Sequence, residues 1–346
     1  MSTLKVDLTS LNTLQVSVKA ENLIEVNYQT DISNFDFTSP HLLLGSGANI
    51  LFTKDFPGTI LKINLPGKKI LSESASDVQI EIGAGESWHE LVKWTVQSGW
   101  YGLENMALIP GTVGAAIVGN IAAYGQNVMD TFVSASGIHL PSKTPQTFTF
   151  SDCEFTYRSS IFKTKLDQKF LITSVVFNLS KIPKLETSYT ATHHASLLPT
   201  LQKIASPPYT NQNIFDAVVK LRTEKLPDWH TFPNAGSFFK NPVISQAHYH
   251  KIKAIIPDLQ AYPPEKLIQS NVQATTDQVK VPAGHLLDQL GWKGKRIGNV
   301  GTHPNHALVI INYGATGKEI YEFSEQMRMD IKTNFDIDLE YEVKII

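Results

Sequence analysis

The sequence predicts an α+β protein with more than one domain, and three observations lead to this prediction. The chain has 346 residues, enough for two or three domains that each bury a core. Runs typical of strands alternate with amphipathic runs typical of helices along its length. A polar, proline-containing stretch, Lys181 to Asn213, separates two such regions. We therefore expect domains at residues 1–185 and 214–346, joined by a connection at 186–213.

Composition excludes several classes of protein. With 30 basic and 32 acidic residues the net charge is -2, so no overall field favours nucleic acid or an anionic membrane as a partner. The first ten residues lack the apolar core of a signal peptide, and we expect a cytoplasmic monomer. The single cysteine, Cys153, excludes an internal disulfide and fits a reducing compartment. We expect it to be a buried, inert thiol.

The N-terminal region reads as strands at 14–18, 23–26 and 42–44. The last of these runs into a glycine turn and then into Ile50 and Leu51. Such a turn exposes successive backbone N–H groups and suits a diphosphate. The turn lacks the spacing and the following helix of a Rossmann site, so no Rossmann fold is predicted. The candidate anion-binding residues are Gly45, Ser46, Gly47, Ala48, Asn49 and Ile50.

The next region combines a strand, a helix and a long uncharged run. Val78 to Ile82 reads as a strand, and Trp88 to Ser98 as an amphipathic helix that ends at Gly99. Met106 to Ala123 then contains no charge, but its proline, asparagine and glycines make a membrane helix improbable. Its small residues either leave room for a flat ligand against the backbone or form a tightly packed core loop. From pattern alone the two readings are equal.

The middle of the chain reads as strands at 132–138, 147–150 and 170–179, followed by a short helix at 197–204. Arg158 lies among aromatic and hydroxyl residues, which suggests a cation held in a partly desolvated place. It can pair there with the carboxylate or phosphate of a ligand, or it can form a structural salt bridge.

The C-terminal region reads as helices at 214–222, 247–256 and 318–334, with a further helix beginning near Val281 and ending near Gln289. Residues 291–305 form a glycine-rich basic loop, and 306–312 a strand. The chain ends on an alternating strand, 339–346, with Glu342 on its polar face. From pattern alone, Glu342 is a solvated edge carboxylate.

The stretch Pro233 to Pro242 concentrates polar, aromatic and turn-forming residues. Asn234 and Gly236 permit positive φ, and Phe238 with Phe239 can anchor the segment in a core. We expect a turn that presents the hydroxyl of Ser237 for chemistry. The alternative is a serine that caps neighbouring amides.

No metal site is predicted. The histidine pairs 193 and 194, 248 and 250, and 303 and 306 lack a surrounding cluster of cysteines or carboxylates.

Taken in order, these motifs resemble the bacterial UDP-N-acetylenolpyruvoylglucosamine reductases, flavoenzymes of peptidoglycan precursor synthesis. The resemblance runs from Asn12 to the C-terminal strand and therefore covers nearly the whole chain. Its most specific parts are Ile109-Pro110-Gly111-Thr112-Val113-Gly114, Tyr157-Arg158, Lys225-Leu226-Pro227, Asn234 to Pro242, and Leu339-Glu340-Tyr341-Glu342-Val343.

The resemblance implies an FAD-binding half of two α+β subdomains, similar to the vanillyl-alcohol oxidase type, and a C-terminal α+β substrate domain. It implies that NADPH reduces FAD, which then reduces UDP-N-acetylglucosamine enolpyruvate to UDP-N-acetylmuramate. Arg158, Ser237 and Glu342 match the catalytic positions. Besides the turn at 45–50, the cofactor-binding positions fall on Pro110, Gly111, Thr112, Gly114, Asn120, Ile121, Ala123, Tyr124 and Gly125. Tyr189, Lys225, Asn241 and Gln289 match the substrate-contacting positions, and the Tyr189 region resembles the type I subfamily.

The chain departs from the family pattern at four positions. Ala48 stands where the family usually has serine and Ala122 where it has glycine, while Pro233 and Tyr341 replace a usual glycine and proline. None of these changes removes a group that does chemistry. Two other readings stay open: a flavin oxidase of the same superfamily, which needs neither Ser237 nor Glu342, and a nucleotide-sugar binding module, which needs no flavin turn.

Overall fold

The computed structural model describes residues 5–187, 196–262 and 277–346, and these form two compact units. The C-terminal unit contains the described parts of 1–21, 47–57 and 225–346, and the central unit contains those of 22–46 and 58–224. The chain therefore changes unit inside the turn at 45–50, between Ser46 and Gly47. These units do not coincide with the predicted domains, 1–185 and 214–346. The assignment of those domains to FAD binding and substrate binding stays a prediction.

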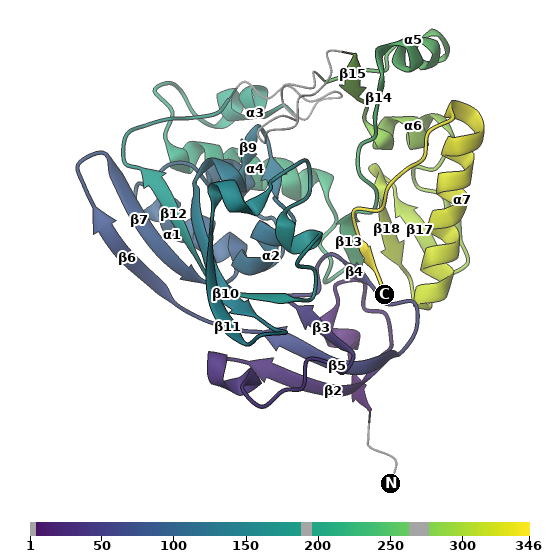
Figure 1. Cartoon of the computed structure of the whole chain (residues 1–346). Helices are drawn as coiled ribbons and strands as arrows, with labels where there is room; N and C mark the ends of the chain where they lie inside the picture. The colour runs from purple at the N-terminus through teal and green to yellow at the C-terminus, as the bar shows by residue number, and fades with distance from the viewer. Residues whose placement is uncertain (1–4, 188–195, 263–276) are drawn as a thin grey trace. The chain divides into compact units, whose positions relative to one another are not determined.

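The central unit is built on a five-stranded antiparallel sheet (Figure 1). Its strand order is β11 (Thr144–Thr149), β10 (Phe132–His139), β12 (Phe170–Ser180), β7 (Asp77–Gly83) and β6 (Lys68–Glu73). Helix α1 (Trp88–Gln97) begins at Ser87, whose hydroxyl accepts the N–H of Glu90, and is followed by Gly99 at φ +73°. Its apolar face is buried, and Trp88 also donates its indole N–H to the carbonyl oxygen of Met106 at 3.0 Å. Burial and hydrogen bonding together fix the start of this helix.

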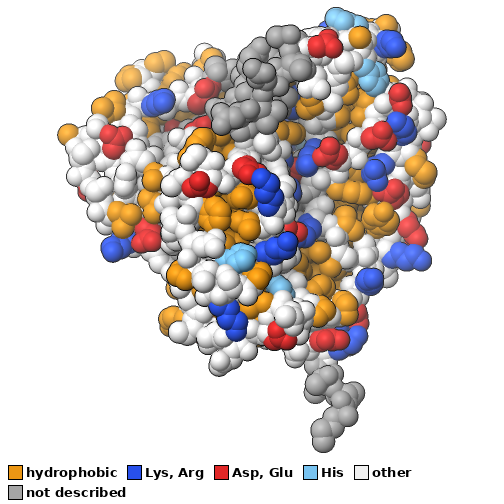
Figure 2. All heavy atoms as spheres, viewed as in Figure 1, with side chains coloured by type: hydrophobic (Ala, Val, Ile, Leu, Met, Phe, Trp, Pro, Cys, Tyr) orange, Lys and Arg blue, Asp and Glu red, His pale blue; other side chains and the backbone are white. Residues whose placement is uncertain are grey.

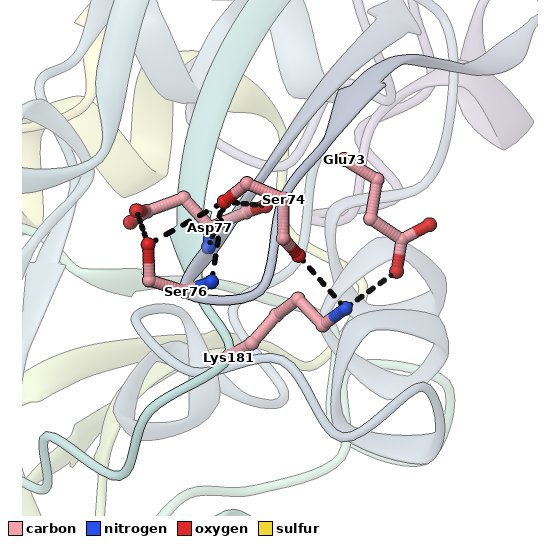
Figure 3. A network of polar contacts seen from close by, with 5 residues as sticks. All are labelled: Glu73, Ser74, Ser76, Asp77 and Lys181. Atoms are coloured by element: carbon pink, nitrogen blue, oxygen red, sulfur yellow. Dashed lines mark hydrogen bonds and ion pairs between the residues drawn. The ribbon is translucent and has the colours of Figure 1, made fainter.

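The turn between β6 and β7 is held by a network of polar contacts (Figure 3). The Ser74 hydroxyl accepts the N–H groups of Ser76 and Asp77, at 3.2 and 3.0 Å. Lys181 reaches over from the end of β12 and donates to the Glu73 carboxylate at 2.8 Å and to the Ser74 carbonyl at 3.0 Å. The network therefore ties the turn between β6 and β7 to the end of β12.

The C-terminal unit is built on the antiparallel sheet β13-β18-β17-β16, with helices α6 and α7 packed against it (Figure 1). Helix α7 (Gly317–Phe335) begins with a capping box, in which Thr316 and Glu319 satisfy each other's backbone N–H groups. Ile320, Phe323 and Met327 are fully buried or nearly so, with 0–2% of their surface exposed. Their spacing of three and four residues forms the apolar face of the helix.

A four-stranded sheet, β1-β2-β5-β3, and three strand pairs, β14-β15, β19-β4 and β8-β9, complete the described structure. The strands are β1 Val6–Asp7, β2 Lys19–Val26, β3 His41–Leu44, β4 Ile50–Leu51, β5 Phe56–Ile63, β6 Lys68–Glu73, β7 Asp77–Gly83, β8 Ala122–Ala123, β9 Gln126–Asn127, β10 Phe132–His139, β11 Thr144–Thr149, β12 Phe170–Ser180, β13 Asn234–Ser237, β14 Val243–Ser245, β15 Gln278–Lys280, β16 Arg296–Ile297, β17 Val300–His303, β18 His306–Asn312 and β19 Lys344–Ile345. The remaining α-helices are α2 Val113–Val118, α3 Leu197–Ile204, α4 Asn211–Lys225, α5 Gln246–Ile255 and α6 Ala283–Gln289.

Most predicted elements are confirmed, and four segments differ. Residues 14–18 form no strand, residues 234–237 form the short strand β13 where a turn was expected, the basic loop at 291–305 contains β16 and β17, and only Lys344–Ile345 of the last segment is a strand. In the first case the side chain of Asn12 takes the place of a neighbouring strand. It accepts the N–H of Val16 at 2.9 Å and donates to its carbonyl at 3.1 Å. Leu14 and Val16 are buried all the same.

The surface agrees with the composition. Positive and negative side chains are interspersed over the face drawn in Figure 2. Within the described ranges, no helix is long and apolar enough to cross a membrane. Cys153 is fully buried, as predicted, and burial raises its pKa to about 12. A thiol in that state reacts slowly.

Candidate active site

The C-terminal unit places Ser237 and Glu342 on neighbouring segments of backbone. The N–H of Glu342 donates to the carbonyl oxygen of Phe238 at 3.0 Å, and that of Lys240 to Glu340 at 2.9 Å. Between these two hydrogen bonds, Phe239 and Tyr341 form an isolated antiparallel β-bridge. Glu342 is therefore paired with the residue that follows Ser237. Ser237 is exposed, whereas Phe238 and Phe239 are buried and anchor the segment.

The second half of the glycine turn, which begins at Gly47, lies in the same unit and contacts the Glu342 segment. The side-chain amide of Asn49 donates to the carbonyl oxygen of Glu342 at 3.1 Å, and Lys344 donates its N–H to that of Asn49 at 3.1 Å. Ile50 then pairs in parallel with Lys344. Gly47 has φ +70°, and a Cβ there would lie 2.0 Å from the carbonyl oxygen of Leu11. Only glycine fits this position.

The first half of the turn lies in the central unit against the second predicted cofactor segment. A Cβ on Gly45 would lie 2.8 Å from the Thr112 hydroxyl, so the backbone at 45 and the loop at 111–114 approach closely. Gly111 accepts the N–H of Trp88 at 3.0 Å, and the N–H of Gly114 donates to Ala84 at 2.9 Å. The adjoining Pro110 is exposed. Lys62, which the sequence analysis did not single out, donates to the carbonyl oxygen of Gly45.

The segment 120–125 has a strained backbone. Asn120 and Tyr124 have positive φ, at +42° and +47°, and Gly125 follows at +90°. Positive φ is uncommon outside glycine and is a genuine outlier for a residue as bulky as tyrosine. Ala123 pairs with Gln126, and Ile121 accepts the N–H of Val128, so the strain is held by backbone hydrogen bonds. Strain of this kind concentrates at ligand sites.

Arg158 contacts this same segment. Its guanidinium donates to the carbonyl oxygen of Ala122 at 3.1 Å, and its backbone φ is +54°. Because the side chain is only partly buried, further guanidinium N–H groups can reach a ligand. The sequence prediction of a partly desolvated cation is confirmed at this position.

The structure also reveals a second arginine, Arg222 of α4, which sequence reasoning missed. Its Nε is buried and has no hydrogen-bond partner among the described residues. Burial lowers its pKa, Tyr124 opposes this shift, and the positive charge of Arg158 adds to it. The two arginines and Tyr124 therefore lie close enough to interact. No local pattern distinguishes Arg222 in the sequence, because its burial and its charged neighbours come from distant segments.

Two of the predicted substrate contacts, Asn241 and Gln289, lie at opposite ends of α6. Asn241 accepts the N–H of Ala283, the first residue of α6, at 3.0 Å, and Gln289 is its exposed last residue. Tyr189 lies outside the described residues, as do His193 and His194.

His306, a second residue that sequence reasoning missed, feels the charge of Lys225. Burial lowers the pKa of His306 to about 4, and Lys225 and His303 add to the shift. His306 is therefore neutral at pH 7. Its Nδ1 accepts the N–H of Leu308 at 3.2 Å, so the ring proton lies on Nε2 and can be donated.

The chemistry of the donors fits a dinucleotide and does not indicate a metal. The buried polar atoms without a partner in the described structure include Ser46 Oγ and Asn120 Oδ1, both in predicted cofactor segments. Such atoms cost about 1–3 kcal/mol each unless a ligand or water meets them. No group of three or more histidine, cysteine or acidic side chains suited to a metal occurs among the described residues. Among the described residues, the unpaired Ser46 hydroxyl can donate to a phosphate and the unpaired Asn120 oxygen can accept a ring N–H, so both fit FAD.

Comparison with known proteins agrees with this site. Residues 227–346 match the C-terminal domain of UDP-N-acetylenolpyruvoylglucosamine reductase, and residues 37–137 match an FAD binding domain. The reductase of Flavobacterium johnsoniae is 39% identical over 344 residues, covering 98% of each chain. One from Bacteroides fragilis is 36% identical over 347 residues, covering 99% of each.

Two solved structures share the fold. The crystal structure of the Thermus caldophilus reductase matches with a TM-score of 0.68 at 21% identity, covering 99% of this chain and 98% of that one. A solvent-stable cholesterol oxidase matches with a TM-score of 0.52 at 10% identity, covering 98% and 86%. At such identities a match shows the fold alone. The predicted α+β fold, with an FAD-binding part of the vanillyl-alcohol oxidase type, is confirmed.

Proposed function

Because the chain belongs to the UDP-N-acetylenolpyruvoylglucosamine reductase family, it is an FAD-containing oxidoreductase, and we propose that Arg158, Ser237 and Glu342 carry its chemistry. The reaction is the reduction of UDP-N-acetylglucosamine enolpyruvate to UDP-N-acetylmuramate in peptidoglycan synthesis. A hydride and a proton add across the enolpyruvyl double bond while NADPH is oxidised to NADP⁺. FAD, when bound, carries the hydride from NADPH to the substrate.

The observation that carries the proposal is the backbone pairing of Glu342 with Phe238, the residue that follows Ser237. One backbone hydrogen bond, from the N–H of Glu342 to the carbonyl oxygen of Phe238 at 3.0 Å, holds the backbone of Glu342 beside the segment that presents the Ser237 hydroxyl. Hydride addition to the methylene carbon leaves negative charge on the adjacent carbon and its carboxylate. Arg158 and Glu342 stabilise that charge as a cation and as a hydrogen-bonding carboxyl group, and Ser237 donates the proton.

The remaining predicted residues bind the cofactor or the substrate. Gly45 to Ile50 bind the FAD diphosphate through backbone N–H groups, the loop at 110–114 lies beside it, and 120–125 lies against the flavin. Lys225, Asn241 and Gln289 bind the UDP-sugar, together with Tyr189. NADPH and the sugar use one site in turn, since the chain has no separate dinucleotide fingerprint. We further propose that the protein is a cytoplasmic monomer with no nucleic-acid or membrane partner, which its low net charge supports.

Anaerobic stopped-flow spectroscopy tests the function directly. NADPH is expected to bleach the flavin absorbance, and the enolpyruvyl sugar to restore it without oxygen. Initial rates should give the parallel lines of ping-pong kinetics, and Lys225→Ala should raise the KM for the sugar more than it slows flavin reduction. An enzyme that is reoxidised only by oxygen would be a flavin oxidase. Intersecting lines would contradict the shared site.

A further inference from the structure

Tyr341, next to Glu342, is held by contacts on three sides. Its ring stacks on Phe239, with ring centroids 5.3 Å apart and planes 29° apart, and meets Phe238 edge-on at 5.8 Å. Its hydroxyl donates to the Glu325 carboxylate and lies 2.9 Å from the Ser324 hydroxyl. Both of these residues belong to α7. Tyr341 thus connects the Ser237 segment to the long helix.

The anchor on α7 is itself braced. Arg328 pairs with Glu325 at 2.6 Å, and its Nε donates to the carbonyl oxygen of Leu339 at 3.0 Å. Its guanidinium also lies 5.1 Å from the Tyr341 ring centroid. Burial alone would raise the pKa of Glu325, but the hydrogen bonds from Tyr341 and Arg328 outweigh burial and lower it. Glu325 therefore stays charged and is a strong acceptor for the Tyr341 hydroxyl.

Packing alone does not fix this ring. Tyr341 is only partly buried and borders a surface hollow of about 550 Å³ with Tyr321 and Lys318. Between the end of α7 and β19 the chain belongs to no regular strand, and Tyr341 makes an isolated bridge to Phe239. The hydroxyl contacts with Glu325 and Ser324 add directional bonds to this packing.

We propose that Tyr341 is a positioning residue, whose hydroxyl anchor on α7 fixes the register of the Glu342 segment against the Ser237 segment. The inference rests on the proposed function, in which Ser237 and Glu342 act on the substrate. The resemblance does not imply this role, because it puts a proline at this position, and proline has no hydroxyl and no aromatic ring to stack. The anchor acts on the geometry of the two segments, and none of its residues is among the predicted cofactor-binding positions.

Tyr341→Phe tests the anchor because it removes one oxygen and keeps the ring. Reoxidation of the reduced holoenzyme by the enolpyruvyl sugar should slow by at least ~10-fold, since a misplacement of about 1 Å can cost about 10²-fold. Reduction by NADPH, FAD content and the KM for the sugar should stay within about twofold, so kcat carries the loss. Tyr321→Phe is the matched control, a tyrosine of α7 whose ring lies 6.1 Å from that of Tyr341. It should leave both half-reactions unchanged.

Two further variants separate anchoring from general loss of structure. Glu325→Gln keeps an acceptor oxygen and should retain more of the reoxidation rate than Glu325→Leu. The double variant, Tyr341→Phe with Glu325→Leu, should be reoxidised no more slowly than the slower single variant, because both changes remove the same anchor. Additive losses, or equal slowing of both half-reactions, would overturn the proposal.

Ser237→Ala and Glu342→Gln, measured in the same assay, keep this inference separate from the proposed function. If both react at the parent rate, the catalytic assignment fails. If they slow reoxidation while Tyr341→Phe does not, the assignment stands and the positioning role is wrong.

Discussion

The side-chain amide of Asn49 donates a hydrogen bond to the carbonyl oxygen of Glu342, 3.1 Å away. The proposed phosphate-binding turn is therefore hydrogen-bonded directly to the backbone of the proposed catalytic residue Glu342. The parallel pairing of β4 with β19 continues the connection. A change in the shape of the turn should consequently reach Glu342 as well as the cofactor.

Gly47→Ala tests this connection. The new Cβ would meet the carbonyl oxygen of Leu11 at 2.0 Å, at a φ of +70°. We expect a loss of about 2–4 kcal/mol in unfolding free energy, from left-handed strain and overpacking together. FAD affinity and the rate of reoxidation should fall with it.

Gly298→Ala provides the matched control in the same unit. Its φ is +57°, but no atom lies within 4 Å of the added Cβ. It should show the strain alone, about 1–2 kcal/mol. Urea unfolding and FAD titration of both variants make the comparison, and equal losses would mean that the close approach to Leu11 is relieved at little cost.

His306 predicts a specific dependence of stability on pH. Its folded pKa of about 4 lies below the ordinary 6.5, so the unfolded chain binds the additional proton between these values. Stability from this group is therefore complete above about pH 6.5 and declines as pH falls toward 4, by roughly 2 kcal/mol at pH 5. His306→Gln should remove that part of the decline in chemical denaturation measured from pH 7 to pH 5. An NMR titration placing the His306 midpoint near 6.5 would contradict it.

We expect Arg222 to lower the stability of the folded protein while strengthening the binding of an anionic substrate. Its buried Nε lacks a partner in the described structure and Arg158 repels it, so the site is unfavourable until an anionic group arrives. Arg222→Met should leave the Tm of the substrate-free holoenzyme unchanged or raise it. The added stabilisation by the enolpyruvyl sugar should shrink, and its KM should rise by about 10-fold, as for loss of a charged hydrogen bond.

Lys220→Met is the control for that variant, on the same helix but in an exposed pair with Glu224 at 2.9 Å. It should change neither quantity measurably. A fall in Tm for Arg222→Met with an unchanged KM would make the arginine a structural residue.

Periodic segments could be predicted from the sequence because local signals agreed there. The helix predicted at 197–204 is found at Leu197–Ile204, and the helix at 88–98 is confirmed by its cap at Ser87 and its end near Gly99. Residues 14–18 show the limit of such reasoning. Alternation correctly predicted which side chains are buried, but whether a strand forms depends on a partner, and here Asn12 supplies the hydrogen bonds.

In the candidate site, too, local motifs could be predicted from the sequence, whereas contacts between distant segments could not. Glycine-rich turns and the Ser237 stretch are visible as motifs, because their backbone demands are local. Arg222 and His306 gave no such signal, since what distinguishes them is burial and charged neighbours from distant segments. The bond between Asn49 and Glu342 spans nearly the whole chain, so no local pattern predicts it.

The last prediction concerns Ser237, which we propose donates the proton that completes the reduction. A serine hydroxyl is a weak acid, so it serves only when held within hydrogen-bond reach, roughly 2.6–3.2 Å, of a strongly basic centre. The left-handed φ of +69° at Gly236 and the two buried phenylalanines that follow hold the exposed hydroxyl in place. Ser237→Ala should reduce normally with NADPH but reoxidise with the enolpyruvyl sugar at least ~10²-fold more slowly. Ser237→Cys should recover part of that rate, because a thiol can also donate. An alanine variant that reoxidises at the parent rate, or loses both half-reactions equally, would make Ser237 a structural residue.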